Sequence, residues 1–149
     1  MKRTLQLTLA LAAFVAGPAE AGSFTLAIGA PVAAQDFRAK NAAFVVRADS
    51  CAVVEKVELK ATAEGLVNGA RKTLPLNLTA VTKPGVYAVS QQWPAEGAWV
   101  VSLTGKCQSE TAGAIVPIGG KGFVRESIQS LPHAPTEAEV AASLKSLAR

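Results

Sequence analysis

The sequence predicts an all-β domain, a β-sandwich of seven to eight antiparallel strands followed by a short C-terminal helix. Residues 22–130 show almost no helical periodicity, and short runs rich in valine, threonine and leucine recur there between turn signals. The pair Asn68-Gly69 joins two of these runs, as a hairpin turn would. Thr136 and Glu139 then form a capping-box pattern ahead of an amphipathic segment. We therefore expect one sandwich domain over residues 22–130, with a proline-containing linker and helix over 131–149.

The first 21 residues have the pattern of a secretory signal peptide. Lys2 and Arg3 precede an apolar run over residues 5–16, which is too short for a stable membrane span. Residues 19–21, Ala-Glu-Ala, supply the small residues of a cleavage site, so we expect cleavage after Ala21. An uncleaved membrane anchor is the alternative that the short run disfavours. The sequence thus predicts a periplasmic or secreted domain with no stable membrane anchor after cleavage.

The predicted strands are apolar runs bounded by glycine, proline and asparagine. They cover residues 24–29, 42–48, 53–67, 70–81, 86–92, 98–106, 114–118 and 122–128. If successive strands alternate in direction, the second and sixth end at the same end of the sandwich. Cys51 and Cys107 follow those two strands directly.

The two cysteines are therefore predicted to form a structural disulfide. An exported protein enters a compartment where thiols oxidise. By closing a loop, such a bond would add about 4 kcal/mol to the free energy of unfolding, because it lowers the entropy of the unfolded chain. A two-thiolate metal site and a redox-active pair are the alternatives, although redox pairs usually have the spacing Cys-x-x-Cys.

The turn at Asn68-Gly69 fixes a register for the third and fourth predicted strands. Both residues accept the positive φ angles of a type I′ turn, which pairs Val67 with Ala70. The inward pairs are then Ala63 with Leu74, Ala61 with Leu76, Leu59 with Leu78 and Val57 with Ala80. The opposite face carries Glu64, Thr73, Lys60, Asn77, Glu58 and Thr79, and we expect it to meet water.

The fourth strand is predicted to be a sheet edge. Pro75 falls opposite Thr62 at a position where the missing N–H would point away from the partner strand. The exposed residues of this edge, Arg71, Lys72, Thr73 and Pro75, are the first candidates for a surface that contacts a protein partner. The alternative is that a charged edge only protects the sheet against aggregation.

A second hairpin is predicted between residues 84–92 and 98–103. Tyr87, Trp93 and Trp99 lie at alternating positions, which would bring the three aromatic rings to one side of this hairpin. Aromatic residues with this period usually belong to the core, and a surface that stacks on a ligand is the alternative.

The C-terminal segment is predicted to form a helix that begins at Thr136. Val140, Leu144 and Leu147 lie on one face, so we expect this helix to pack on the sandwich. The alternative is a docking helix for a partner, with Glu137 and Lys145 on the contacting face.

Composition and motifs disfavour several classes of function. Loss of Lys2, Arg3 and Glu20 with the signal would leave 13 of the 15 basic and 10 of the 11 acidic residues, a mild positive charge. The charge and the export signal disfavour nucleic-acid binding. His133 is the only histidine, and it is predicted to lie in a loop. The acidic residues are scattered singly and show no carboxylate pair, so we expect no enzyme activity.

No cofactor or metal site is predicted. Copper sites use methionine, cysteine, histidine or carboxylates, and the only methionine is Met1, which leaves with the signal. The glycines of residues 119–122 are more simply a turn than a phosphate-binding loop.

Gly85, Tyr87, Gly97 and Trp99 form a Gly-x-Tyr and Gly-x-Trp pattern within residues 84–103. This stretch resembles part of the YtkA-like and FixH-like periplasmic domains, and more broadly the immunoglobulin-like sandwiches that include the CopC-type copper carriers. The resemblance implies an immunoglobulin-like fold and an accessory role beside a membrane transporter or an oxidase-assembly system. The histidine and methionine ligands of the carriers have no counterpart here.

The function predicted from the sequence is that of an exported, non-catalytic binding or accessory module that contacts a protein partner. A periplasmic metal-carrier or metal-assembly factor is the alternative, and an enzyme whose residues gather only in space is the third hypothesis. The sequence leaves the oligomeric state open.

Overall fold

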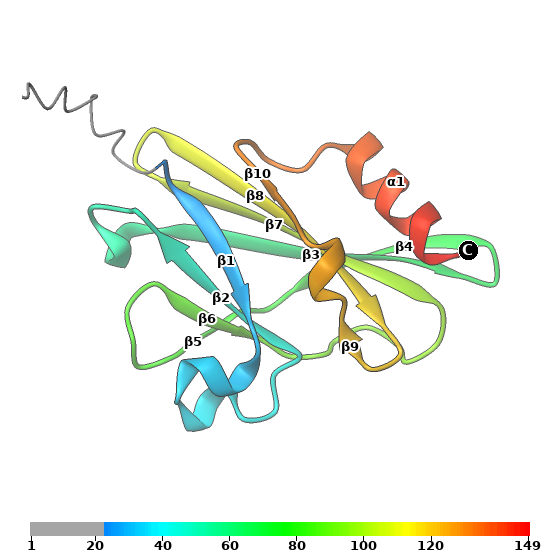
Figure 1. Cartoon of the computed structure of the whole chain (residues 1–149), viewed down its shortest axis with the longest axis horizontal. Coiled ribbons are helices and arrows are strands. Elements are labelled where there is room, and N and C mark those ends of the chain that lie inside the picture. Colours follow the sequence, from blue (N-terminus) through cyan, green and yellow to red (C-terminus); the bar gives the residue numbers. More distant parts are fainter. Residues whose placement is uncertain (1–22) are drawn as a thin grey trace, which may run out of the picture.

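A computed structural model describes residues 23–149 as two antiparallel sheets packed face to face, with one helix (Figure 1). The predicted signal peptide and its cleavage site lie outside the described residues. The four-stranded sheet has the order β1 (Thr25–Gly29), β2 (Phe44–Asp49), β6 (Val86–Val89), β5 (Thr79–Ala80). The six-stranded sheet has the order β10 (Gln129–Leu131), β8 (Glu110–Gly119), β7 (Ala98–Cys107), β3 (Glu58–Val67), β4 (Ala70–Leu76), with β9 (Gly122–Phe123) also paired to β8. The helix α1 spans Glu137–Leu147.

The predicted β-sandwich with a C-terminal helix is confirmed, but residues 23–149 form ten strands rather than seven or eight. The predicted strand over 70–81 divides into β4 and β5. The predicted strand over 122–128 is replaced by β9, a 3₁₀ turn (η4, Arg125–Ser127) and then β10. In residues 23–149 no helix has the length and apolar character needed to cross a bilayer.

The hairpin of β3 and β4 has the predicted register. Val67 lies opposite Ala70, and Thr62 lies opposite Pro75. The turn residues Asn68 and Gly69 have φ values of 51° and 77°, as a type I′ turn requires. β4 pairs only with β3, so the prediction of an edge strand is confirmed.

The predicted pairs beyond Leu76 are wrong. Pairing with β3 ends at Ala61–Leu76, and the chain then crosses to the other sheet, where Thr79 and Ala80 pair with β6. The side chain of Gln92 holds this crossing. Its Oε1 accepts the backbone N–H of Asn77 and its Nε2 donates to the carbonyl of Asn77, both at 2.9 Å. The side-chain amide of Gln92 thus supplies the hydrogen bonds that a neighbouring strand would otherwise make to Asn77.

The predicted second hairpin is also wrong, because its two strands belong to different sheets. β6 pairs with β2 and β5, whereas β7 pairs with β3 and β8. The aromatic residues nevertheless form part of the core, as predicted. Trp93 and Trp99 are buried and Tyr87 is half-buried, all in the cluster between the sheets. The Trp99 indole N–H donates to the carbonyl of Glu96 at 2.7 Å, which ties the connecting loop to β7.

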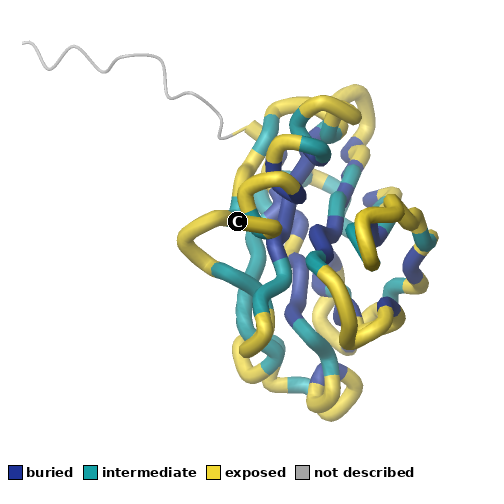
Figure 2. The backbone as a smooth tube through the Cα atoms, turned by 90° about the vertical axis from the view of Figure 1, so that its right-hand side faces the viewer, coloured by how far each residue is buried: buried dark blue, intermediate teal, exposed yellow. Residues whose placement is uncertain are grey.

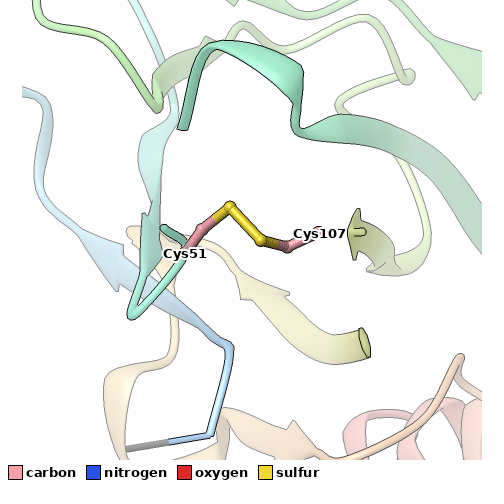
Figure 3. Close-up of a disulfide and its surroundings, with 2 residues drawn as sticks. All are labelled: Cys51 and Cys107. Atoms are coloured by element: carbon pink, nitrogen blue, oxygen red, sulfur yellow. A yellow bond between two sulfur atoms is a disulfide. The ribbon is translucent and has the colours of Figure 1, made fainter. Parts of the chain in front are cut away.

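The predicted disulfide between Cys51 and Cys107 is present (Figure 3). Cys51 follows β2 of one sheet, and Cys107 is the last residue of β7 of the other sheet. Their Cα atoms are 5.9 Å apart. The bond therefore links the two layers covalently at one end of the sandwich, and it indicates an oxidising compartment.

The helix α1 packs on the outer face of the six-stranded sheet, as expected. Val140 and Leu144 are buried there against Val100 and Ile115. The expectation that this face meets water is therefore wrong where the helix lies, and Glu64 of β3 is only 9% exposed. A helix can cover this region because the apolar side of the helix packs against apolar residues on the outer face of the sheet.

Residues 30–43 cover the outer face of the four-stranded sheet, and we call this segment the lobe. It contains two 3₁₀ turns, η1 (Pro31–Ala34) and η2 (Phe37–Ala39). Ala39 is fully buried against Val45, Val86 and Ala88. Viewed from the side, the buried strands lie between more exposed segments (Figure 2).

Candidate interaction surface

Arg71, Lys72, Thr73 and Pro75 all lie exposed on β4, and we call these four residues the β4 edge. In a two-residue hairpin the closing pair, Val67 and Ala70, exchanges hydrogen bonds, and every second pair after it does the same. Lys72 therefore directs its backbone groups to β3. Arg71 and Thr73 direct theirs away from the sheet, and Pro75 offers only its carbonyl. The edge thus presents a short, unpaired row of backbone donors and acceptors.

Arg71 connects the β4 edge to β3 and to α1. Its Nη2 donates to Glu64 Oε2 at 2.5 Å, and its Nη1 contacts Glu137 Oε1 at the start of the helix. The hydrogen bond that Arg71 donates to Glu64 raises the pKa of Arg71, so the guanidinium stays charged. The structure therefore brings together two candidates that were predicted separately, the β4 edge and the helix face that carries Glu137.

Lys72 and Lys145 have a different setting. Lys72 lies on the opposite face of β4 from Arg71, because side chains alternate along a strand. Lys145 is on the exposed side of α1 near its C-terminal end. Within residues 23–149 neither ammonium group has a carboxylate at ion-pair distance. Lys72 thus leaves a positive charge beside the unpaired strand.

His133 lies at the start of α1 and contacts the residues that cap the helix. Its Nε2 is 3.5 Å from Glu139 Oε1, and its Nδ1 is 2.9 Å from the carbonyl oxygen of Ala134. Glu139 in turn accepts the backbone N–H of Thr136, and this hydrogen bond lowers the pKa of Glu139. The contacts of the histidine are therefore those of a helix start.

A hollow of about 550 Å³ that sequence reasoning missed lies at one end of the sandwich. Trp93, Trp99 and Phe123 line it, together with the loops at 94–98 and 119–122, and no charged side chain does. The two indoles are only 5% and 2% exposed, so they form its floor and offer little surface for stacking. The tryptophans and the small residues clustered in both loops are the sequence signals for it.

The described part of the chain, residues 23–149, brings no group of three or more histidine, cysteine, aspartate or glutamate side chains together at metal-binding spacing. Comparisons with protein-family models, with curated proteins and with solved structures found no match.

Proposed function

We propose that this protein is an exported, non-catalytic binding module with an immunoglobulin-like fold, and that it contacts a protein partner through the β4 edge. Strand order supports the fold assignment. Immunoglobulin domains arrange strands A, B, E and D in one sheet and strands G, F and C in the other. The sheets here follow the same order, β1-β2-β6-β5 and β8-β7-β3, with β4 continuing the second sheet next to β3.

The position of the disulfide gives independent support. In antibody domains the conserved bridge joins strands B and F of opposite sheets. Cys51 and Cys107 lie at the ends of β2 and β7, the second and seventh of the eight strands that match this order. The Gly-x-Tyr and Gly-x-Trp strands then occupy positions E and F. The elements β9, β10 and α1 are additions after the last of these strands.

Two observations support a location outside the cytoplasm. The bridge between Cys51 and Cys107 is stable in an oxidising compartment. The pattern of residues 1–21 is that of a secretory signal. Together they favour a periplasmic or secreted protein.

The unpaired backbone of β4 is the observation that carries the proposed contact. An extended segment of a partner can add to such an edge, because its main chain completes the hydrogen bonds of Arg71 and Thr73. Pro75 restricts the row to these two residues, which limits uncontrolled pairing while leaving a short segment able to bind. Lys72 on one face of the strand favours a partner segment with an acidic side chain opposite it.

The substitution Thr73→Pro tests this contact directly. It removes one outward N–H without removing a hydrogen bond to β3, and Pro75 already occupies the equivalent position two residues on. We expect the wild-type mature protein to capture a partner from its native envelope, and Thr73→Pro to lose it with little change in melting temperature.

Thr73→Ala is the matched control, because it removes the side chain and keeps the N–H. Capture by Thr73→Ala but not by Thr73→Pro would support strand addition, whereas equal capture by both variants would place the contact elsewhere. Metal analysis of the same preparations, and a melting temperature raised by copper or zinc, would favour the metal-carrier alternative instead.

A further inference from the structure

Two large apolar residues in residues 23–149 are almost fully exposed to solvent, and both belong to the lobe. Val32 of η1 is 81% exposed and Phe37 of η2 is 79% exposed. Most exposed apolar residues in proteins are scattered singly, whereas these two are five positions apart in one short segment. Figure 1 shows the lobe at the lower edge of the view, away from α1 and β4.

The lobe is held in place, so the exposure of Phe37 is part of the fold. Asp36 Oδ1 accepts the backbone N–H of Arg38 at 2.8 Å, and Asp36 Oδ2 accepts the backbone N–H of Thr82 at 2.7 Å. These hydrogen bonds lower the pKa of Asp36. Ala39 anchors the same turn in the sheet, because it is fully buried. One end of η2 is thus fixed, and Phe37 projects from it.

Positive charge exceeds negative charge around the exposed ring. The Arg38 guanidinium carbon lies 5.5 Å from the centroid of Phe37, and Lys83 borders the same shallow hollow as Phe37. Lys40 lies one residue beyond η2. Among the described residues no carboxylate lies within ion-pair distance of these three cations. Asp36 borders the same hollow, where both of its oxygens accept backbone N–H groups and its charge offsets part of the charge of Arg38.

From this arrangement we infer that the lobe is a docking site for an anionic phospholipid surface, with Phe37 and Val32 entering the interface and Arg38 and Lys83 contacting the headgroups. Aromatic and aliphatic side chains flanked by cations are the combination that binds such surfaces. Both apolar side chains project outward, so a fluid interface can surround them without a preformed pocket. A protein partner would have to supply a pocket for each. The site lies on the opposite sheet from the β4 edge and does not depend on it.

Co-sedimentation with vesicles tests this inference on the mature protein. The probes are vesicles of phosphatidylcholine alone and vesicles that also contain phosphatidylglycerol, each at low and at high salt. We expect binding to the anionic vesicles only, and weaker binding at high salt because the charges are exposed. Phe37→Ser is expected to lower the partition coefficient roughly 30-fold through the lost apolar burial. Lys83→Gln is expected to lower it about fivefold.

Lys60→Gln on β3 is the matched control, since it removes one exposed cation from the six-stranded sheet, opposite the sheet that carries the lobe, and should leave vesicle binding unchanged. The melting temperature of Phe37→Ser should equal that of the wild type, because the side chain is exposed. Absence of sedimentation at low salt would overturn the inference, as would equal binding by the wild type and Phe37→Ser. A crosslink from residue 37 to a soluble protein, without vesicle binding, would also overturn it in favour of a protein partner.

Discussion

Arg71 neutralises a carboxylate that the fold has largely covered. The Glu64 side chain is 11% exposed, and α1 lies over the same face of the sheet. A carboxylate in this position is costly unless a cation and hydrogen bonds compensate it. Arg71 supplies both, and it also reaches Glu137 on α1. This residue therefore has a structural role in addition to its place on the candidate surface.

Arg71→Ala should lower the free energy of unfolding by about 1 kcal/mol, because Glu64 would stay largely buried without a cation beside it. The cost is limited because Arg71 itself is partly exposed to solvent, which weakens the ion pair. Lys72→Ala is the neighbouring control and should change stability by less than about 0.5 kcal/mol. Urea unfolding of the two variants measures the difference. Equal stabilities would show that water solvates Glu64 without help from Arg71.

Gly65→Ala is expected to be strongly destabilising. A Cβ at this position would lie 2.4 Å from Cδ2 of the buried Trp99 ring, which is tied by its N–H to the loop. Such overpacking costs about 3 kcal/mol. Gly120→Ala, where a Cβ would meet nothing within 4 Å, should be close to neutral. If Gly65→Ala had the same melting temperature as the wild type, the Trp99 indole would be able to shift and accommodate the methyl group.

The helix α1 shows how a marginal element is stabilised by its surroundings. A helix of eleven residues is barely stable in water by itself. Here the capping box closes its first turn, because Thr136 Oγ1 accepts the N–H of Glu139 and Glu139 accepts the N–H of Thr136. Val140 and Leu144 then bury its apolar stripe on the sheet. Its stability should therefore respond both to the cap and to packing.

Thr136→Ala should destabilise α1 by about 1 kcal/mol through loss of the cap. Amide hydrogen exchange resolves the effect by element, so the amides of α1 should exchange faster while those of β7 keep their protection. The variant Thr136→Ser retains the hydroxyl and is expected to behave as the wild type. Faster exchange throughout the domain would show that α1 and the sandwich unfold as one unit.

Acid should loosen the start of α1. The pKa of Glu139 lies below its ordinary value because the backbone N–H of Thr136 donates to the ionised carboxylate. A lowered pKa in the folded state means that the cap contributes fully above the ordinary value of 4.5 and is lost as the pH falls through the lowered one. Chemical shifts of the first-turn amides should follow this titration. In Glu139→Gln the same amides should show no transition in this range.

The domain as a unit depends on the contact between its two sheets. Phe44 and Val46 of one layer meet Trp99, Val101 and Leu103 of the other, and all are buried. The disulfide adds a covalent link between the layers. The covered outer faces add two smaller clusters, one beneath the lobe and one beneath α1.

Loss of the disulfide should cost about 4 kcal/mol, since the bond closes a loop across a sequence separation of 56 and so restricts the unfolded chain. Denaturant unfolding of a Cys51→Ala, Cys107→Ala double variant measures this cost. The reduced wild-type protein is the control and should unfold at nearly the same concentration. A double variant as stable as the oxidised protein would contradict the entropic account.

Local patterns were enough to predict several parts of this fold. The Asn68-Gly69 turn specifies its own register, because a two-residue turn leaves the flanking strands a single alignment. The capping box marks the start of α1 for a similar reason, since its contacts span three residues. The positions of Arg71, Thr73 and Pro75 on a free edge followed from the same short-range geometry.

Apart from the Cys51–Cys107 disulfide, most long-range features could not be predicted in this way. Alternation of apolar residues shows that a strand has an inward face, but the pattern is identical for two strands of one hairpin and for two strands that face each other across a core. The aromatic residues of 87–99 were therefore assigned correctly to the core and wrongly to one sheet. The crossing at Asn77, the contact of Arg71 with Glu137 and the exposure of Phe37 depend on segments that meet only after the sheets have packed. Turn and cap geometry is encoded within a few residues, whereas the choice of sheet is decided by which arrangement buries the apolar faces of the entire chain.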